Sequence, residues 1–165
     1  MARKVFYSFH YKPDNWRASQ VRNIGVLEGN EPTSDNGWET ITKGGDAAIQ
    51  KWIDSQMSGR PCAVVLIGTD TANRKWINYE IIKAWNDKKG VFGIYVHYLM
   101  DSQKRQSLKG SNPFDFITFG PSGPKLSTVV KVYEPPFLDS TQVYAYIQKN
   151  IGNWVETAIA QRALH

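Results

Sequence analysis

Near-continuous apolar runs recur along this chain and predict its strands. Residues 4–9 (KVFYSF) and 62–68 (CAVVLIG) are almost wholly apolar, and residues 90–99 and 127–134 are rich in Val, Ile and Tyr. A shorter apolar run at 23–29 predicts a fifth strand. Runs of this length that do not alternate with polar residues are typical of strands buried on both faces, as in a parallel sheet covered by helices.

Helical spacing of apolar residues fills the segments between these runs. We predict helices over residues 14–23, 45–59, 73–90 and 139–164. Asp14 and Asp139 stand where a side chain can cap a helix N-terminus. Because a glycine weakens a helix interior, Gly152 is expected to bend the last helix or to divide it into two.

This alternation of strands and helices predicts a single α/β domain over residues 1–165. We expect a flavodoxin-like, doubly wound parallel sheet of five strands in the order 2-1-3-4-5, with helices on both faces. The segment 103–126, rich in Gly, Pro and Ser, replaces or shortens the helix between the fourth and fifth strands. Ligands of such sheets bind beyond the carboxyl ends of the strands where the strand order reverses, which places 8–17 and 68–76 at the ligand edge. The long polar loop 28–46 can fold over the same edge.

Composition narrows the class of protein and of partner. The chain has 165 residues and a net charge of +5, but its basic residues are scattered, which favours a solvated surface over nucleic-acid binding. The lone Cys62 excludes an internal disulfide and is predicted to be a core residue, so the reducing cytoplasm is the expected compartment. No apolar run approaches the roughly 20 residues that span a membrane. His10, His97 and His165 are too far apart in sequence to predict a metal site.

The helix over 73–90 places one carboxylate beside the predicted ligand edge. Its apolar stripe, which would face the sheet, comprises Ile77, Ile81 and Ala84. Trp76, Glu80 and Lys83 form the neighbouring stripe at helical spacing. Glu80 would then lie at the border between core and surface. From the spacing alone, it is more often a solvated charge or a partner of Lys83 than a reactive group.

The order of these motifs resembles the TIR domain family. A strand VFYSF near the N-terminus precedes a polar loop with an arginine, a strand VVLIG and a helix bearing W-x-x-x-E. The segments KVFYSFHYKPDNWRASQVRN and IGTDTANRKWINYEI are similar to the first and third strand regions of the bacterial TIR-like proteins of the Thoeris anti-phage defence system. The resemblance covers about residues 3–100 and weakens over 103–165.

The resemblance implies an enzyme that cleaves NAD at the nicotinamide–ribose bond. Glu80 maps onto the catalytic glutamate of the family's W-x-x-x-E helix, and Trp76 onto its tryptophan. The substrate cleft of the family also uses residues just after the first strand, which here are Ser8, Phe9, His10 and Arg17. Three residues of the second loop are further candidates on proximity alone and match no family motif: Asp35, Asn36 and Trp38.

NAD would be the substrate, so the resemblance implies neither a resident cofactor nor a metal. Similar proteins make ADP-ribose-derived signal molecules that activate a partner effector, and TIR enzymes often self-associate to complete the active site. Water as the acceptor gives ADP-ribose, a group of ADP-ribose itself gives a cyclic product, and another small molecule gives a conjugate. Two alternatives stay open: a non-catalytic TIR module that signals by association, and a flavodoxin-like domain that binds a flavin or another nucleotide.

Overall fold

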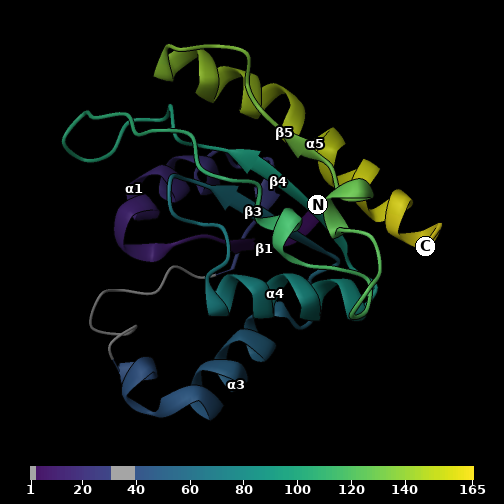
Figure 1. Cartoon of the computed structure of the whole chain (residues 1–165). Coiled ribbons are helices and arrows are strands. Elements are labelled where there is room, and N and C mark those ends of the chain that lie inside the picture. The colour runs from purple at the N-terminus through teal and green to yellow at the C-terminus, as the bar shows by residue number, and fades with distance from the viewer. Residues whose placement is uncertain (1–2, 31–39) are drawn as a thin grey trace.

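Five parallel strands form the sheet at the centre of the molecule. A computed structural model of the chain describes residues 3–30 and 40–165 (Figure 1). The strands are β1 (Arg3–Ser8), β2 (Leu27–Glu28), β3 (Cys62–Ile67), β4 (Gly90–Tyr95) and β5 (Val132–Tyr133). Each pairs in parallel with its neighbours in the order β2-β1-β3-β4-β5. The predicted fold class and strand order are therefore confirmed.

Side chains that alternate along the strands cover the two faces of the sheet. Val5 and Val64 point to the face that α1 (Tyr11–Arg22) and α5 (Ser140–Ala163) cover. The opposite face packs against α3 (Gly45–Met57) and α4 (Lys75–Asn86), with residues such as Phe6 and Val65 at the contact. Figure 1 shows the two pairs of helices on either side of the sheet. Because both faces are covered, β3 and β4 are buried along their whole length.

The two edge strands are much shorter than the apolar runs predicted. Only Leu27–Glu28 of the predicted strand 23–29 is extended, because Gly25 takes a φ of 84° in the turn that leaves α1. Most of the run 127–134 is likewise not strand, since the 3-10 helix η2 (Leu126–Thr128) occupies its start. Edge strands have one neighbour only, so loop geometry decides where their pairing begins.

Two predictions about helix ends have opposite outcomes. Asp139 caps α5 as predicted, because its carboxylate accepts a hydrogen bond from the Gln142 N–H at 3.1 Å. Asp14 does not cap α1, which begins earlier, at Tyr11. Pro13 fits the first turn of that helix because its missing N–H would have no helical partner there.

The predicted division of the last helix at Gly152 is absent, since α5 runs unbroken from Ser140 to Ala163.

The segment between β4 and β5 contains no α-helix, as predicted. It contributes two 3-10 helices, η1 (Pro113–Phe116) and η2, which bury Phe114 and Leu126 against the α4 side of the sheet. Its backbone also passes directly over the end of β3. The hydroxyl of Thr69 donates to the Leu108 carbonyl, and a Cβ on Gly110 would lie 2.2 Å from the Gly68 oxygen. A glycine is therefore needed where this segment crosses the loop after β3.

Candidate active site

A pocket of about 620 Å³ lies at the carboxyl ends of β1 and β3. This is the point at which the strand order reverses, and therefore the place where doubly wound sheets bind ligands. The end of β1, the start of α4 and residues of α1 and α3 line it. Its walls comprise Phe6, Tyr7, Phe9, His10, Tyr11, Lys12, Arg22, Asn30, Trp52, Asn73, Arg74, Lys75, Trp76, Ile77 and Glu80.

Glu80 is buried and turns inward from α4. It is 8% exposed, on the same side of the helix as the buried Ile77 and Ile81. The Ser8 hydroxyl, at the end of β1, donates a hydrogen bond to Oε1 of Glu80 at 3.2 Å. Burial raises the pKa of Glu80 to about 8, although the hydrogen bond from Ser8 acts in the opposite direction. Glu80 is thus not the solvated charge that its helical spacing alone would favour.

Aromatic rings form much of the pocket wall. Phe9 and Tyr11 stack with ring centroids 6.2 Å apart, and both line the pocket. Trp76 lies one helical turn before Glu80, and Trp52 reaches the pocket from α3. Rings that stand around a pocket of this size provide flat apolar surfaces on which a planar base can stack.

Basic side chains line much of the pocket. Lys12, Arg22, Arg74 and Lys75 line the pocket, where Glu80 is the one acidic residue among those described. Arg22 donates to the Asn30 carbonyl at 3.0 Å, and Lys75 forms an ion pair with Asp46. Because the basic side chains outnumber the acid and burial keeps the acid largely protonated, the pocket favours an anionic ligand.

His10 adds a neutral polar group to the same wall. Burial lowers its pKa, as do the nearby charges of Arg74 and Lys12, so the imidazole is uncharged at neutral pH. Its Nδ1 atom is buried and has no hydrogen-bond partner in the described part of the chain. A neutral imidazole of this kind can exchange a hydrogen bond with a ligand hydroxyl.

The structure brings together five of the residues predicted for the site. Phe9, His10, Trp76 and Glu80 line the pocket, and Ser8 contacts Glu80 from beneath it. Their parts in substrate binding and catalysis stay predictions. The candidates Asp35, Asn36 and Trp38 lie outside the described residues.

Arg17 does not join the pocket. It is 3% exposed, and its guanidinium pairs with Asp14 at 3.0 Å and donates to the backbone carbonyls of Leu99 and Arg105. These contacts fasten α1 to the chain that leaves β4. The prediction took Arg17 because it follows the first strand, but a helical turn carries its side chain away from the carboxyl end of β1. Arg22 and Arg74 are the arginines that reach the pocket.

Several residues that line the pocket were not predicted, although the segments that contain them were expected at the ligand edge. Tyr11 and Lys12 lie in the segment 8–17, and Arg74 and Lys75 lie in 68–76, both of which were expected at the ligand edge. Their position at the start of a helix was the available signal. Trp52, by contrast, has the spacing of a core residue in its helix, so nothing in the sequence separates it from its buried neighbours.

The described residues contain neither a metal-binding cluster nor a membrane-spanning helix. No group of three or more His, Cys, Asp or Glu side chains there is arranged to hold a metal ion. Among the helices of residues 3–30 and 40–165, none has the length and apolar character needed to cross a bilayer. Cys62 is fully buried in β3, where burial raises its pKa to about 12, which confirms its assignment to the core.

Comparison with known proteins places this site in a family. The family described as Thoeris protein ThsB, TIR-like domain, matches residues 6–101. The chain belongs to this family. The matched region runs from β1 through α4 to the residues after β4, and so contains Ser8, Trp76 and Glu80. The TIR-like fold inferred from the order of the motifs is thereby confirmed.

A curated relative supports the same assignment. The ThsB-like chain is 33% identical over 124 residues to the Bacillus cereus (strain MSX-D12) protein named "Putative cyclic ADP-D-ribose synthase ThsB1". The alignment covers 72% of this chain and 65% of that relative, so the chain spans just under two thirds of the relative's length. The relative's name refers to the synthesis of cyclic ADP-D-ribose.

Proposed function

We propose that this protein cleaves NAD at the nicotinamide–ribose bond and makes a cyclic derivative of ADP-ribose. One observation carries the proposal: a buried carboxyl group, Glu80, faces a pocket walled by aromatic rings and basic side chains at the switch point of the sheet. Membership of the TIR-like ThsB family and the name of the Bacillus cereus relative support this choice of substrate.

Glu80 is suited to stabilise the charge that develops during cleavage. When the bond between C1′ and the nicotinamide nitrogen breaks, its electron pair leaves with nicotinamide, which becomes neutral. Positive charge then develops on the ribose, as in glycoside hydrolysis. An ionised carboxylate beside C1′ stabilises that charge strongly because little water shares the pocket. The cationic nicotinamide ring of bound NAD favours ionisation of Glu80 before the bond breaks.

The other pocket groups match the remaining parts of NAD. The rings of Trp76 and Phe9 offer stacking surfaces for a flat base. Arg74 stands at the N-terminus of α4, where its charge and the helix N–H groups attract the pyrophosphate. No general acid is required, because nicotinamide leaves as a stable neutral molecule.

Cyclisation needs a nucleophilic group of the same ADP-ribose, and we take a hydroxyl as that group. The hydroxyl oxygen forms a bond to C1′ and its proton is released, so NAD yields one cyclic product, nicotinamide and one proton. Burial of the reacting carbon supports this route, because a folded substrate that fills the pocket leaves little room for water. The neutral His10 is positioned to accept or donate a hydrogen bond at such a hydroxyl. The product would act as a diffusible signal for a nucleotide-sensing effector.

The test is to replace Glu80 by Gln, which keeps the size of the side chain and its ability to accept from Ser8. We expect nicotinamide release from NAD to fall at least about a hundredfold, a typical cost of losing a key electrostatic group. Glu134→Gln is the matched control and should retain activity. Glu134 directly follows β5, and its exposed carboxyl group pairs with Lys109. Mass spectrometry of the product distinguishes cyclic from linear ADP-ribose. Undiminished nicotinamide release by the Glu80 variant would exclude Glu80 as the catalytic group, whereas no release by the unmodified chain would favour a non-catalytic signalling module.

A further inference from the structure

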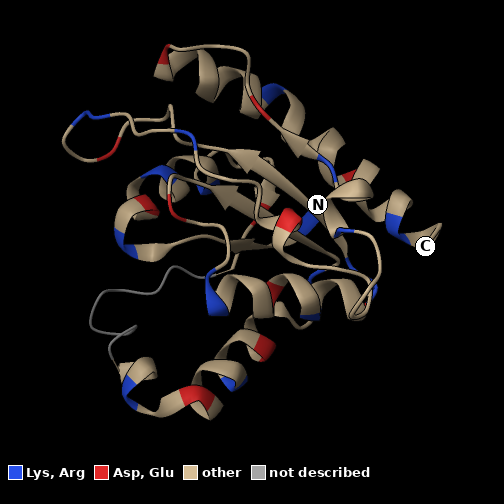
Figure 2. Cartoon of the chain, viewed as in Figure 1, with Lys and Arg blue, Asp and Glu red and all other residues tan. Residues whose placement is uncertain are grey.

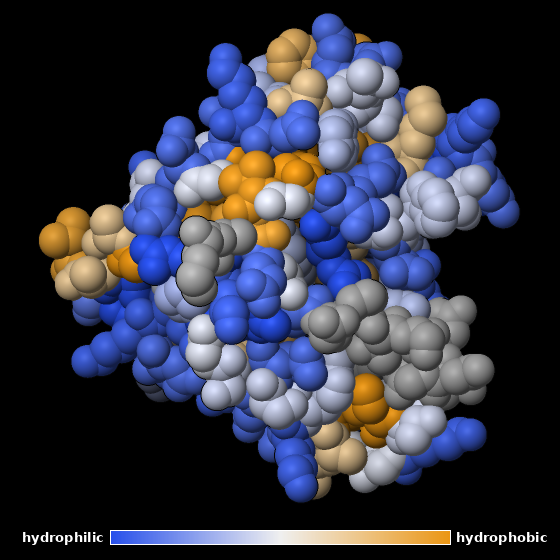
Figure 3. Space-filling view, turned by 180° about the vertical axis from the view of Figure 1, so that it is seen from behind, coloured by the Kyte–Doolittle hydropathy of each residue, from blue (hydrophilic) through white to orange (hydrophobic). Residues whose placement is uncertain are grey.

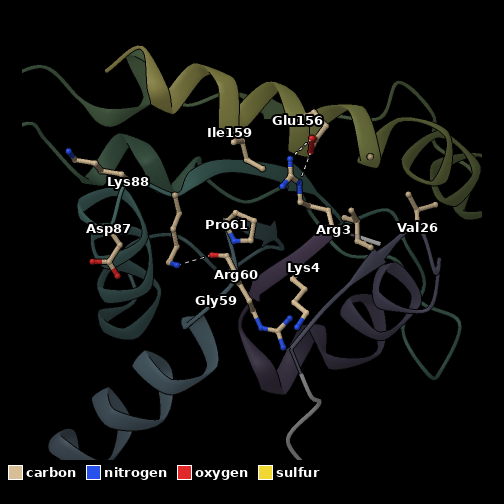
Figure 4. A pocket seen from close by; sticks show the side chains of 13 residues that line it. Arg3, Lys4, Val26, Gly59, Arg60, Pro61, Asp87, Lys88, Glu156 and Ile159 are labelled. Carbon is tan, nitrogen blue, oxygen red and sulfur yellow. Dashed lines mark hydrogen bonds and ion pairs between the residues drawn. The ribbon is translucent and has the colours of Figure 1, made fainter. Parts of the chain in front are cut away.

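A second hollow lies at the opposite edge of the sheet. Its volume is about 1000 Å³, and it is bounded by the amino ends of β1 and β2, the turns that precede β3 and β4, and α5 (Figure 4). None of its residues lines the Glu80 pocket, which is at the carboxyl ends of the strands. We call it the amino-edge groove.

Basic charge predominates on this groove. Five of its lining residues are Lys or Arg and two are acidic. Both acids already have partners: Glu156 pairs with Arg3 at 2.6 Å, and Asp87 pairs with Lys83 at 2.9 Å. Arg3 is therefore the one basic residue of the groove with a carboxylate partner among the residues described.

The remaining cations lack charge compensation. Arg60 donates to the backbone carbonyls of Val5 and Glu28, and Lys89 donates to the carbonyl of Arg60 at 2.8 Å. These carbonyl groups hold the side chains in place but do not neutralise their positive charges. Lys4 and Lys88 are exposed and form no ion pair within the described residues. The groove thus presents several fixed or available positive charges to a ligand.

Its apolar surface is aliphatic. Val26, which is 45% exposed, together with Pro61 and Ile159, contributes this surface, and no aromatic side chain lines the groove. The Glu80 pocket, by contrast, is walled by aromatic rings. A nucleotide gains much of its affinity from base stacking, so the amino-edge groove is poorly suited to one. A polypeptide that carries carboxylates and aliphatic side chains fits both kinds of surface.

A second copy of the chain is a poor occupant. The protein has a net charge of +5, and its acidic residues are spread over many elements without forming an acidic face in the view of Figure 2. Charge complementarity therefore points to a different protein. We propose that the amino-edge groove docks an acidic, aliphatic-rich segment of a partner protein.

The experiment uses a fluorescent peptide of alternating Glu and Val, with binding to the full chain measured by polarisation. Lys4→Glu/Lys88→Glu reverses two charges on the groove at exposed positions. We expect its affinity for the peptide to be at least about tenfold weaker than that of the unmodified chain. Lys51→Glu/Lys104→Glu is the control. It makes the same change in net charge away from the groove. Lys104 has a φ of 60° and Lys88 a φ of 62°, so each variant contains one substitution at a backbone position with positive φ.

Retained affinity in the control and loss in the groove variant would support the proposal. Amide NMR shifts confined to residues of the groove, which are 3–4, 26–27, 59–60, 87–89, 152, 156 and 159, would locate the peptide without any substitution. No binding by the unmodified chain, equal loss in both variants, or shifts at the Glu80 pocket would overturn the proposal. So would tighter binding of a single-stranded oligonucleotide of equal charge at these residues. None of these outcomes bears on NAD cleavage, which the Glu80 experiment tests separately.

Discussion

At the scale of single residues, Glu80 shows how burial changes the protonation of a common side chain. A carboxylate loses most of its hydration in the pocket, and the single hydrogen bond from Ser8 does not replace it. The charged state is therefore unfavourable until a cation arrives. In the proposed reaction, NAD brings one in its nicotinamide ring, and cleavage moves that positive charge to the ribose.

This burial has a measurable effect on stability. The pKa of Glu80 is raised from 4.5 to about 8 in the folded state, so between these values the folded chain binds more protons than the unfolded chain. The free energy of unfolding contributed by this group therefore falls as pH rises through that window. Glu80→Gln removes the titration, and we expect the variant to gain about 3 kcal/mol over the unmodified chain between pH 5 and pH 8.5.

Urea unfolding at several pH values checks this expectation. The difference in stability between the variant and the unmodified chain should be small near pH 5, grow steadily up to about pH 8 and then level off. Glu134→Gln, at an exposed carboxyl, should follow the unmodified chain throughout. Parallel pH profiles for the Glu80 variant and the unmodified chain would show that the carboxyl group is not buried as described.

The sequence anticipates some of these residues better than others. Helical spacing correctly places Ile77 and Ile81 in the core, and Glu80 follows them inward because it lies on the border of the same stripe. The choice of arginine fails because sequence order does not determine which way a side chain leaves a helix. Asp14 and Arg17, three residues apart, instead form a buried pair. Opposite charges at helical spacing usually lie on the surface, so nothing in the sequence marks this pair as buried.

At the scale of elements, the central strands are predictable and the edge strands are not. β1, β3 and β4 begin within a residue of their apolar runs, because burial on both faces requires apolar side chains at every position. β2 and β5 have two residues each, and apolar residues near them belong to turns that pack on helices. Hydrophobic runs identify burial, whereas strand ends depend on the backbone of the neighbouring loop.

Two glycines test how closely α5 packs against its neighbours: Gly90 at the start of β4 and Gly152 within α5 itself. A Cβ on Gly90, at the start of β4, would lie 2.7 Å from the backbone nitrogen of Ile159 and 2.8 Å from the carbonyl carbon of Ala158. Because backbone must move to relieve this contact, Gly90→Ala should destabilise the protein by about 2 kcal/mol or more.

Gly152→Ala is the matched substitution within α5. Its Cβ would approach only the Val26 side chain, at 3.3 Å, and that side chain is partly exposed and can shift. Alanine also favours the helix interior over glycine, so a gain of about 0.5 kcal/mol is expected. Thermal unfolding of both variants checks the pair. A loss of stability at Gly152 would show that the helix needs a glycine there, as its sequence first suggested.

At the scale of the whole molecule, the two hollows occupy opposite edges of one sheet. The carboxyl edge is aromatic and holds the buried acid, whereas the amino edge is aliphatic and basic. Seen from behind, the surface is largely hydrophilic, with an apolar patch near its centre (Figure 3). The family match covers residues 6–101, so much of the amino-edge groove lies within it, while the part of the groove on α5 does not.

The net charge of +5 gives the whole molecule an attraction for anions that salt should weaken. NAD carries a net negative charge on its pyrophosphate, and basic residues surround the Glu80 pocket. Raising NaCl from about 0.05 M to about 0.5 M shortens the Debye length to less than half. We therefore expect kcat/KM for NAD to fall about threefold or more over this range.

Nicotinamide riboside separates this effect from a general effect of salt on the fold. It contains the same bond to nicotinamide but no phosphate, and its net charge is positive, so its kcat/KM should not fall as salt is added. Arg74→Gln should make the NAD profile shallower, because one of the charges nearest to the proposed pyrophosphate position is removed. Equal salt sensitivity of the two substrates would mean that the basic residues of the pocket do not guide the phosphates. Nicotinamide release, measured for both substrates across the salt series, decides between these outcomes.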